Sequence, residues 1–247
     1  MVDILLTNDD GFRSIGFAPL LEELSKRYSV LAIAPLSERS WIGKAISLEK
    51  VTIQKEKLGN RECYSCTGTP ADCVQIGLYN LLTEKPKIVL SGINIGANVG
   101  VGRILSSGTI GAGMEASIAG IKAIASSFHF PNKANFDLQS SDNYHLLSHA
   151  VAITMNMIDR FMANEWEKNV DILSINIPPD ATKDSPVEMT VPDRSSYGQL
   201  YQEQNGTFIR KIPRVDTAQG KKGTDTFSLH QGNISLTPIS LDLKANS

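Results

Sequence analysis

The chain has 247 residues, of which 41% are hydrophobic and 20% charged, so it can bury a sizeable core in one large domain or in one domain with an appendage. The formal net charge of -2 gives no reason to expect nucleic acid or an acidic membrane as the main partner, although a small anionic substrate is compatible with it. The first apolar stretch, at residues 4–6, is too short for a secretory signal, and no run approaches the roughly 20 apolar residues of a membrane span, so we expect a cytoplasmic protein.

Short apolar runs alternate with amphipathic stretches along the first two-thirds of the chain. In chain order, the sequence predicts a strand at residues 4–7, a helix at 15–27, strands at 30–34 and 46–53, a helix at 70–82, a strand at 88–91, a helix at 110–119, a strand at 123–128, a helix at 142–161 and a strand at 172–177. Pro70 opens its helix in the first turn, where a proline is tolerated. Strands that alternate with helices predict a mostly parallel sheet that is covered on both faces.

The composition changes after Pro179. Residues 180–228 are polar and rich in turn formers, with a short apolar run at 207–212, which we interpret as a β-hairpin or an extended arm that serves oligomerisation. The segment 233–243 again alternates like a strand, although Pro238 lies inside it. We therefore divide the chain into a core at residues 1–179 and a C-terminal extension at 180–247, within one domain overall.

The three cysteines, Cys63, Cys66 and Cys73, are an odd number in a chain for which we expect no export, which argues against a disulfide framework. Cys63 and Cys66 form a C-x-x-C pattern that is compatible with a redox pair or with half of a zinc site. The pattern lies in a strand-like stretch instead of at a helix start, and a second pair of ligands is lacking. We therefore expect buried structural thiols, with the other two interpretations as alternatives.

The stretch LLTNDDG, at residues 5–11, ends the first predicted strand. Ligands of open parallel sheets bind outside the carboxyl ends of the strands, and Asp9 and Asp10 follow such an end directly. Where a strand becomes a turn, adjacent carboxylates can converge on one cation, and their hard oxygens suit Mg²⁺ or Mn²⁺. An ordinary turn explains the same residues, because Asn, Asp and Gly are all turn formers. This stretch alone favours neither interpretation.

Two further loops lie just beyond predicted strands. In LSERS, at residues 36–40, Arg39 can meet a phosphate and Ser40 can supply a neutral oxygen ligand, although an ordinary exposed loop is the better explanation of this stretch taken alone. In SGINIGANVG, at residues 91–100, Asn94 and Asn98 lie among glycines, which let the backbone approach a ligand. A loop of Gly and Asn without a ligand is the alternative.

The stretch SSGTIGAGMEAS, at residues 106–117, places Ser107, Gly108 and Thr109 just before a predicted helix. Backbone N–H groups and hydroxyls at a helix N-terminus bind phosphate, although Ser107 or Thr109 can also simply cap the helix. Four loops at one edge of one sheet thus carry two carboxylates, amides, hydroxyls and a helix start. Together they predict a site for a divalent metal ion and a phosphate group.

Six motifs follow one another along the chain: LLTNDDG, APLSERS, TGTPADCV, LSGINIGANVG, SSGTIGAGMEAS and TDTFSLHQGNISLTPISLDL. In this order they resemble the motifs of the SurE survival-protein family, over nearly the whole chain. The resemblance implies a Rossmann-like α/β fold, with a mostly parallel sheet flanked by helices and a C-terminal arm that helps to form homodimers or homotetramers. It also implies a hydrolase, a 5'-nucleotidase that uses one divalent cation, Mg²⁺ or Mn²⁺, to release phosphate from nucleoside 5'- and 3'-monophosphates. Some members also trim short polyphosphate.

The resemblance also assigns roles to single positions. Carried over one by one, the metal ligands are Asp9, Asp10, Ser40 and Asn94. The residues around the phosphate are Asn98, Ser107, Gly108 and Thr109. Asp9 or Asp10 is then the candidate general base. The chain departs from the usual pattern at Trp41, Ala97 and Ser106, which leaves the substrate preference open.

Two other functions stay open from the residues themselves. In an aspartyl-phosphate phosphatase, Asp9 or Asp10 would be the nucleophile, although that chemistry usually brings an Asp-x-Asp spacing and a later lysine. A nucleotide-binding protein without catalysis is the second alternative, because a fold alone does not imply an activity.

Overall fold

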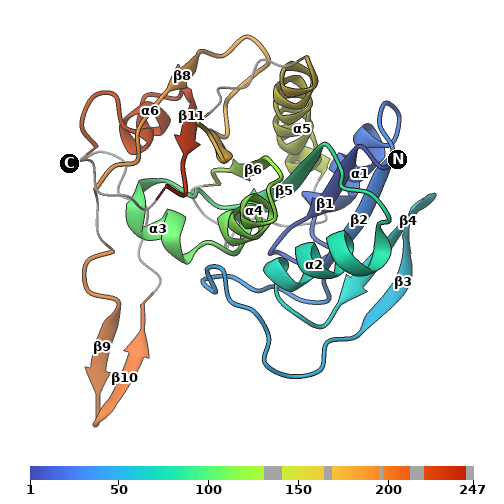
Figure 1. Cartoon of the computed structure of the whole chain (residues 1–247). Coiled ribbons are helices and arrows are strands. Elements are labelled where there is room, and N and C mark those ends of the chain that lie inside the picture. The colour runs from blue at the N-terminus through green and yellow to red at the C-terminus, as the bar shows by residue number, and fades with distance from the viewer. Residues whose placement is uncertain (131–140, 164–168, 195–196, 212–219, 243–247) are drawn as a thin grey trace.

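The computed structural model describes residues 1–130, 141–163, 169–194, 197–211 and 220–242 (Figure 1). Within these ranges, nine strands form one mixed sheet. In spatial order they are β3 (Ile53–Leu58), β4 (Arg61–Cys66), β2 (Val30–Pro35), β1 (Ile4–Thr7), β5 (Ile88–Ile95), β6 (Ala123–Phe128), β7 (Ile172–Ile177), β11 (Ile234–Ile239) and β8 (Val187–Met189). Neighbouring strands run parallel, except that β3 is antiparallel to β4 and β11 is antiparallel to β7. The predicted α/β fold with a mostly parallel sheet is therefore confirmed.

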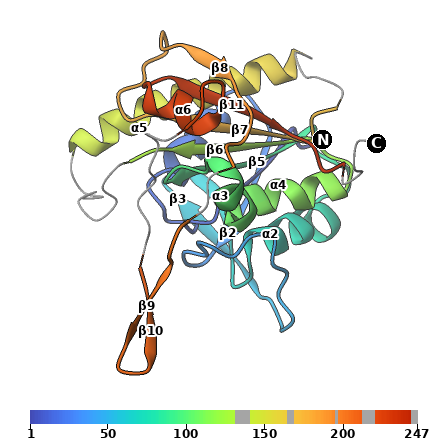
Figure 2. The ribbon, with the colours of Figure 1, turned by 90° about the vertical axis from the view of Figure 1, so that its left-hand side faces the viewer.

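Helices cover both faces of this sheet (Figure 2). They are α1 (Phe17–Leu24), α2 (Pro70–Ile76), α3 (Gly100–Ser106), α4 (Gly108–Ile118), α5 (Ser141–Met162) and α6 (Asp225–His230), with a π-helical turn at Gly77–Leu81 that continues α2. On β1, Ile4 and Leu6 belong to the core layer under α1 and α5, whereas Leu5 belongs to the layer under α2 and α4. Within the described ranges, no helix has the length and apolar character that crossing a membrane requires.

Local sequence explains where α2 and α4 begin. Thr69 caps α2 by accepting the Asp72 N–H (3.1 Å), and the Asp72 carboxylate accepts the Thr69 N–H in return (2.8 Å). Pro70 follows at the first helical position, as predicted. Ser107 caps α4 by accepting the Ile110 N–H (3.1 Å). Both helices therefore start at fixed points beside the ends of strands.

The predicted strand at residues 46–53 is wrong. The strand begins only at Ile53, and the preceding residues form a loop in which the side chain of Leu48 is fully exposed. The backbone N–H of Ser47 donates to the Asp72 carboxylate of α2 (3.2 Å to Oδ1) instead of to a neighbouring strand. The alternating pattern therefore does not make a strand here, because side chains accept the backbone N–H groups of Ser47 and Thr52. Helices α3 and α6 and the short strand β8 were not predicted from the sequence.

The C-terminal part contains the expected hairpin. β9 (Tyr201–Gln204) and β10 (Thr207–Arg210) pair around Asn205 and Gly206, which both have positive φ (+50° and +77°), as a tight two-residue turn requires. All residues of both strands are exposed, and the hairpin projects from the body (Figure 1). The strand predicted near the C-terminus is β11, in which Pro238 is tolerated because β8 pairs only with residues 234–236. The ends of two predicted segments, at Ile212 and Leu243, lie outside the described residues.

The three cysteines are buried free thiols, as expected. Cys63 belongs to the core layer under α1 and α5, whereas Cys66 and Cys73 belong to the opposite layer. Burial raises the pKa of the Cys63 thiol to about 11. Cys63 and Cys66 point to opposite faces of β4, so their sulfur atoms do not face each other although the residues form a C-x-x-C pattern.

Candidate functional site

The predicted site residues gather where three parallel strands end. β2 pairs with β1, and β1 pairs with β5, all in parallel, so their carboxyl ends meet at one edge of the sheet. Helix α4 starts at the same edge, because Thr109 in its first turn contacts Asp9 just after β1. This is the edge at which ligands of open α/β sheets bind.

Asp9 is 4% exposed and is held from two directions. Its Oδ1 accepts a hydrogen bond from the Thr109 hydroxyl (2.7 Å), and its backbone carbonyl accepts the Arg39 N–H (2.7 Å). A Cβ atom on Gly108 would lie 2.8 Å from the Cβ of Asp9 and 3.1 Å from its Oδ2, so only glycine allows this approach. The carboxylate of Asp9 therefore lies directly against the first turn of α4.

Asp10 reaches the neighbouring strand end. Its Oδ2 accepts the backbone N–H of Ile95, the last residue of β5 (2.7 Å). One residue earlier, the buried side chain of Asn94 donates from Nδ2 to the Gly96 carbonyl (2.7 Å), which leaves Oδ1 as its acceptor atom. The expected turn also forms, since Asn8 Nδ2 donates to the Gly11 carbonyl (2.9 Å). A turn and a cation site are thus compatible in this stretch.

The loop after β2 comes close to Asp9 through its backbone. The Ser40 hydroxyl itself donates to Glu38 Oε1 (2.5 Å), and Arg39 Nη2 donates to the Thr67 carbonyl (2.8 Å). The structure therefore places the Ser40 hydroxyl next to the carboxylate of Glu38. That hydrogen bond uses the proton of the hydroxyl and leaves its oxygen lone pairs, so the role of Ser40 as a metal ligand stays a prediction.

The residues predicted to bind phosphate have partners within the protein. Ser107 caps α4, and the Thr109 hydroxyl donates to Asp9. Asn98 is buried and donates from Nδ2 to Ser127 Oγ (2.9 Å), with Thr109 Oγ1 at 3.5 Å. The backbone amides of Gly108 and Thr109 belong to the first turn of α4, where N–H groups have no acceptor within the helix. These two amides can therefore donate to an anion at this edge.

Several polar residues that support this edge were missed in the sequence. Asn176 on β7 accepts the Asn98 N–H at Oδ1 (2.8 Å), and Ser127 on β6 holds the Asn98 side chain. Asp225 accepts the Gly100 N–H (2.8 Å) and the Asp193 N–H (2.9 Å), and its burial raises its pKa against these hydrogen bonds. The available signal was a polar residue inside an otherwise apolar strand, as in ILSINI.

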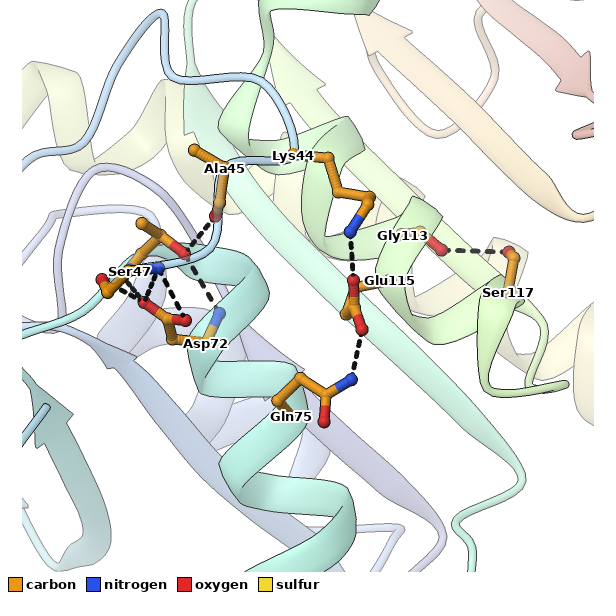
Figure 3. A network of polar contacts seen from close by, with 9 residues as sticks. Lys44, Ala45, Ser47, Asp72, Gln75, Gly113, Glu115 and Ser117 are labelled. Carbon is orange, nitrogen blue, oxygen red and sulfur yellow. Dashed lines mark hydrogen bonds and ion pairs between the residues drawn. The ribbon is translucent and has the colours of Figure 1, made fainter. Parts of the chain in front are cut away.

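The loop that carries Arg39 and Ser40 is fastened to α2 and α4 (Figure 3). Lys44 forms an ion pair with Glu115 on α4 (2.5 Å), and Glu115, which is 4% exposed, also accepts a hydrogen bond from Gln75 on α2. Ser47 donates from its hydroxyl to Asp72 Oδ2 (2.5 Å). These contacts fix the loop along the helix whose first turn touches Asp9.

The chemistry of the donor set fits a hard divalent cation. Among the described residues, no three His, Cys, Asp or Glu side chains gather as a metal-binding group. The predicted set does not require such a group, because it combines the two carboxylates of Asp9 and Asp10 with one hydroxyl and one amide oxygen. The glycine at position 108 also keeps the space beside the Asp9 carboxylate clear of a side chain.

The chain resembles known proteins over nearly its whole length. Residues 4–199 match the family described as "Survival protein SurE". The "5'-nucleotidase SurE" of Archaeoglobus fulgidus is 32% identical over 98% of this chain and 93% of the relative, and that of Methanococcus vannielii is 35% identical with the same coverage. The crystal structure of the Sure protein from Aquifex aeolicus matches with a TM-score of 0.77 at 26% identity, over 98% of this chain and 94% of the other. The chain therefore belongs to the SurE survival-protein family.

Proposed function

We propose that the chain is a metal-dependent 5'-nucleotidase, which hydrolyses nucleoside 5'-monophosphates to a nucleoside and phosphate. Relatives that share the full length of the chain carry the name 5'-nucleotidase SurE, which supports this proposal. The observation that carries it is the contact between Asp9 and the start of α4 through Thr109 and Gly108. A carboxylate that can hold a cation lies there beside amides that can bind the phosphate of the same substrate.

We propose that Asp9, Asp10, Ser40 and Asn94 hold one divalent cation, either Mg²⁺ or Mn²⁺. When bound, such a cation polarises a phosphoryl oxygen and makes a water molecule more acidic. Thr109 fixes the orientation of the Asp9 carboxylate, and Ile95 fixes that of Asp10. Either carboxylate can then accept the proton of the attacking water, as a general base.

The proposed phosphate site is built around the first turn of α4. The backbone amides of Gly108 and Thr109 donate to phosphoryl oxygens, on which charge develops during the reaction. Ser107 can add its O–H, because capping the helix uses only an acceptor lone pair of that hydroxyl. Asn98 lines the same place, since its Nδ2 lies 3.5 Å from the Thr109 hydroxyl.

The proposal extends to nucleoside 3'-monophosphates and to short polyphosphate. Groups that bind only the phosphoryl end make few demands on the leaving group, so a change of its position is tolerated.

We further propose that the core at residues 1–179 carries the site and that the extension at 180–247 assembles a homodimer or homotetramer. The exposed Phe208 and Ile209 on the hairpin support that role. Light scattering of the wild type and of Phe208→Asp tests it, because the substitution should lower the measured mass.

The test of the proposed function is phosphate release from a panel of nucleoside monophosphates at neutral pH, with Mn²⁺, with Mg²⁺ and with EDTA. We expect release with one of the metals and its loss in EDTA. A covalent phospho-enzyme, trapped by rapid acid quenching, would instead support Asp9 or Asp10 as nucleophile. Binding of AMP in Mn²⁺ without turnover would support a binding protein.

A further inference from the structure

Four side chains from separate segments meet beside the proposed site; we call them the Trp41 cluster: Trp41, Arg103, Tyr197 and Arg210. The rings of Trp41 and Tyr197 are tilted by 52°, with centroids 5.0 Å apart. The guanidinium carbon of Arg210 lies 4.2 Å from the centroid of the Trp41 ring, and that of Arg103 lies 5.7 Å from it. The cluster therefore combines two aromatic rings with two planar cations.

The Trp41 cluster lies next to the residues proposed to bind metal and phosphate. Trp41 directly follows Ser40, and two residues later the Gly43 N–H donates to the Ser106 carbonyl (2.9 Å). The Tyr197 hydroxyl donates to Ser106 Oγ (2.5 Å), and Ser106 precedes Ser107, the cap of α4. Trp41 is therefore the chain neighbour of the proposed metal ligand Ser40, and Tyr197 is hydrogen-bonded to the chain neighbour of Ser107.

The backbone at Trp41 is unusual for an aromatic residue. Its φ is +62°, a left-handed conformation that residues other than glycine, asparagine and aspartate rarely adopt. Such a conformation persists only where surrounding contacts determine it, and it is enriched at ligand-binding sites. Here the contacts of Gly43, Arg210 and Tyr197 hold Trp41 in this conformation.

The residues of the Trp41 cluster differ in burial, so one side of the cluster faces the protein and the other faces solvent. Trp41 and Tyr197 are half-buried, and burial lowers the pKa of the Arg103 guanidinium. Arg210, on the projecting hairpin, is exposed, so its guanidinium is the solvent-facing layer over the Trp41 ring. A planar cation backed by an indole is a surface on which another flat aromatic ring can stack.

We propose that the Trp41–Arg210 pair is the subsite for the nucleobase and that it determines a preference for nucleotides with large bases. The inference rests on the proposed function, because the phosphate must be held at α4 while the base stacks on Arg210. Stacking is tolerant of base identity and grows with ring area, so purine nucleotides should be favoured over pyrimidine nucleotides. Both should be favoured over ribose 5-phosphate, which has the same sugar and phosphate and no base.

The experiment compares kcat/KM for AMP, CMP and ribose 5-phosphate in the wild type, Trp41→Ala, Trp41→Phe and Arg210→Ala. We expect Trp41→Ala to lower kcat/KM for AMP by about tenfold or more, in keeping with the loss of a stacked base, and to change that for ribose 5-phosphate by about twofold at most. Trp41→Phe should retain most of the difference between the two substrates. Arg210→Ala alters an exposed residue and should lower kcat/KM for AMP even where Trp41→Ala fails to fold.

Tyr79→Ala is the matched control, because Tyr79 is an exposed aromatic residue (59%) on the turn that continues α2. It should leave kcat/KM for AMP, CMP and ribose 5-phosphate unchanged.

Equal losses of AMP and ribose 5-phosphate hydrolysis in Trp41→Ala, or faster AMP hydrolysis in Arg210→Ala, would overturn the inference. If the wild type hydrolyses none of the three compounds, the proposed function fails, and calorimetry with the same compounds then decides the inference. AMP must bind more tightly than ribose 5-phosphate, and Trp41→Ala must remove the difference.

Discussion

The two ends of the parallel strands are built differently. At the carboxyl ends, the polar residues Asp9, Asn94 and Asn98 are buried, and they are hydrogen-bonded to Thr109 of α4, to the nearby Gly96 carbonyl and to Ser127 of β6, respectively. At the amino ends, a charged residue stands immediately before each of four central strands: Asp3, Lys87, Lys122 and Asp171. Buried polar groups require hydrogen-bond partners, whereas charged residues that are partly exposed tolerate substitution. One edge of the sheet thus carries buried, hydrogen-bonded polar residues, and the opposite edge carries charged residues that pair at the surface.

The amino ends are tied together by contacts at the surface. Asp3 before β1 pairs with Lys87 before β5 (2.9 Å) and accepts the N–H of Ser29 before β2 (3.0 Å). Lys122 before β6 donates to the carbonyl of Val170, and Asp171 accepts the Leu241 N–H (2.7 Å). The contrast predicts that changes at the carboxyl ends lower activity, whereas changes at the amino ends lower stability slightly and leave activity intact.

The largest effect is expected for Asp9→Asn. The amide oxygen can still accept from Thr109, so the fold should persist, while the loss of the charge should lower kcat by about a thousandfold. Phosphate release at saturating Mn²⁺, with circular dichroism as the check on folding, measures the change. Hydrolysis near the wild-type rate would remove Asp9 from the proposed site.

A smaller but still large effect is expected for Gly108→Ala. The new methyl group would lie 2.8 Å from the Cβ of Asp9 and must displace either the carboxylate or the start of α4, so we expect a loss of about a hundredfold in kcat/KM. Gly113→Ala in the same helix is the control, because its Cβ would meet Ile172 (3.1 Å), which is away from Asp9. Equal rates in the two variants would contradict the close approach.

Glu115→Gln should affect the position of the loop behind Ser40. It leaves Lys44 facing a neutral amide, which we expect to cost about 1–3 kcal/mol in the free energy of unfolding by urea and to raise the Mn²⁺ concentration for half-maximal activity. The double variant Lys44→Met/Glu115→Gln removes the unpaired cation and should recover part of the stability. If the metal requirement stays at its wild-type value, the loop does not depend on this ion pair.

The smallest effect is expected at the amino ends, for Asp3→Asn. The hydrogen bond from Lys87, followed by that from Ser29, lowers the pKa of Asp3 below its usual value of 3.8. Its contribution to stability is therefore present above about pH 4 and is lost as the pH falls through the lowered pKa. After allowance for solvent screening, we expect a loss of about 0.2–1 kcal/mol near neutral pH, with kcat unchanged. Unfolding curves of both proteins should converge below the lowered pKa, and a constant difference down to strong acid would contradict this account.

The sequence predicts the strands and the edge at which they end better than it predicts the side-chain contacts at that edge. Continuous apolar runs, such as ILL before Thr7, mark the buried parallel strands and so locate the edge where Asp9 lies. The partners across that edge were not predictable, because they depend on tertiary contacts. Thr109 was expected to face phosphate, and the contact of its hydroxyl with Asp9, a residue one hundred positions earlier, was not foreseen. Residues 46–53 alternate like a strand, but the backbone N–H of Ser47 donates to the Asp72 side chain and that of Thr52 to the Thr67 hydroxyl.

The two outer strands of the sheet have a consequence for association at high protein concentration. An unpaired strand edge is a template for the edge of another copy. β8 has only three residues, and β3 carries the charged run Lys55, Glu56 and Lys57. A short edge strand offers few free backbone amides, and charged side chains on an edge strand disfavour pairing with the same strand of another copy. Within the part of the chain that the structure describes, both outer strands of the sheet therefore have features that disfavour pairing between the edges of two copies.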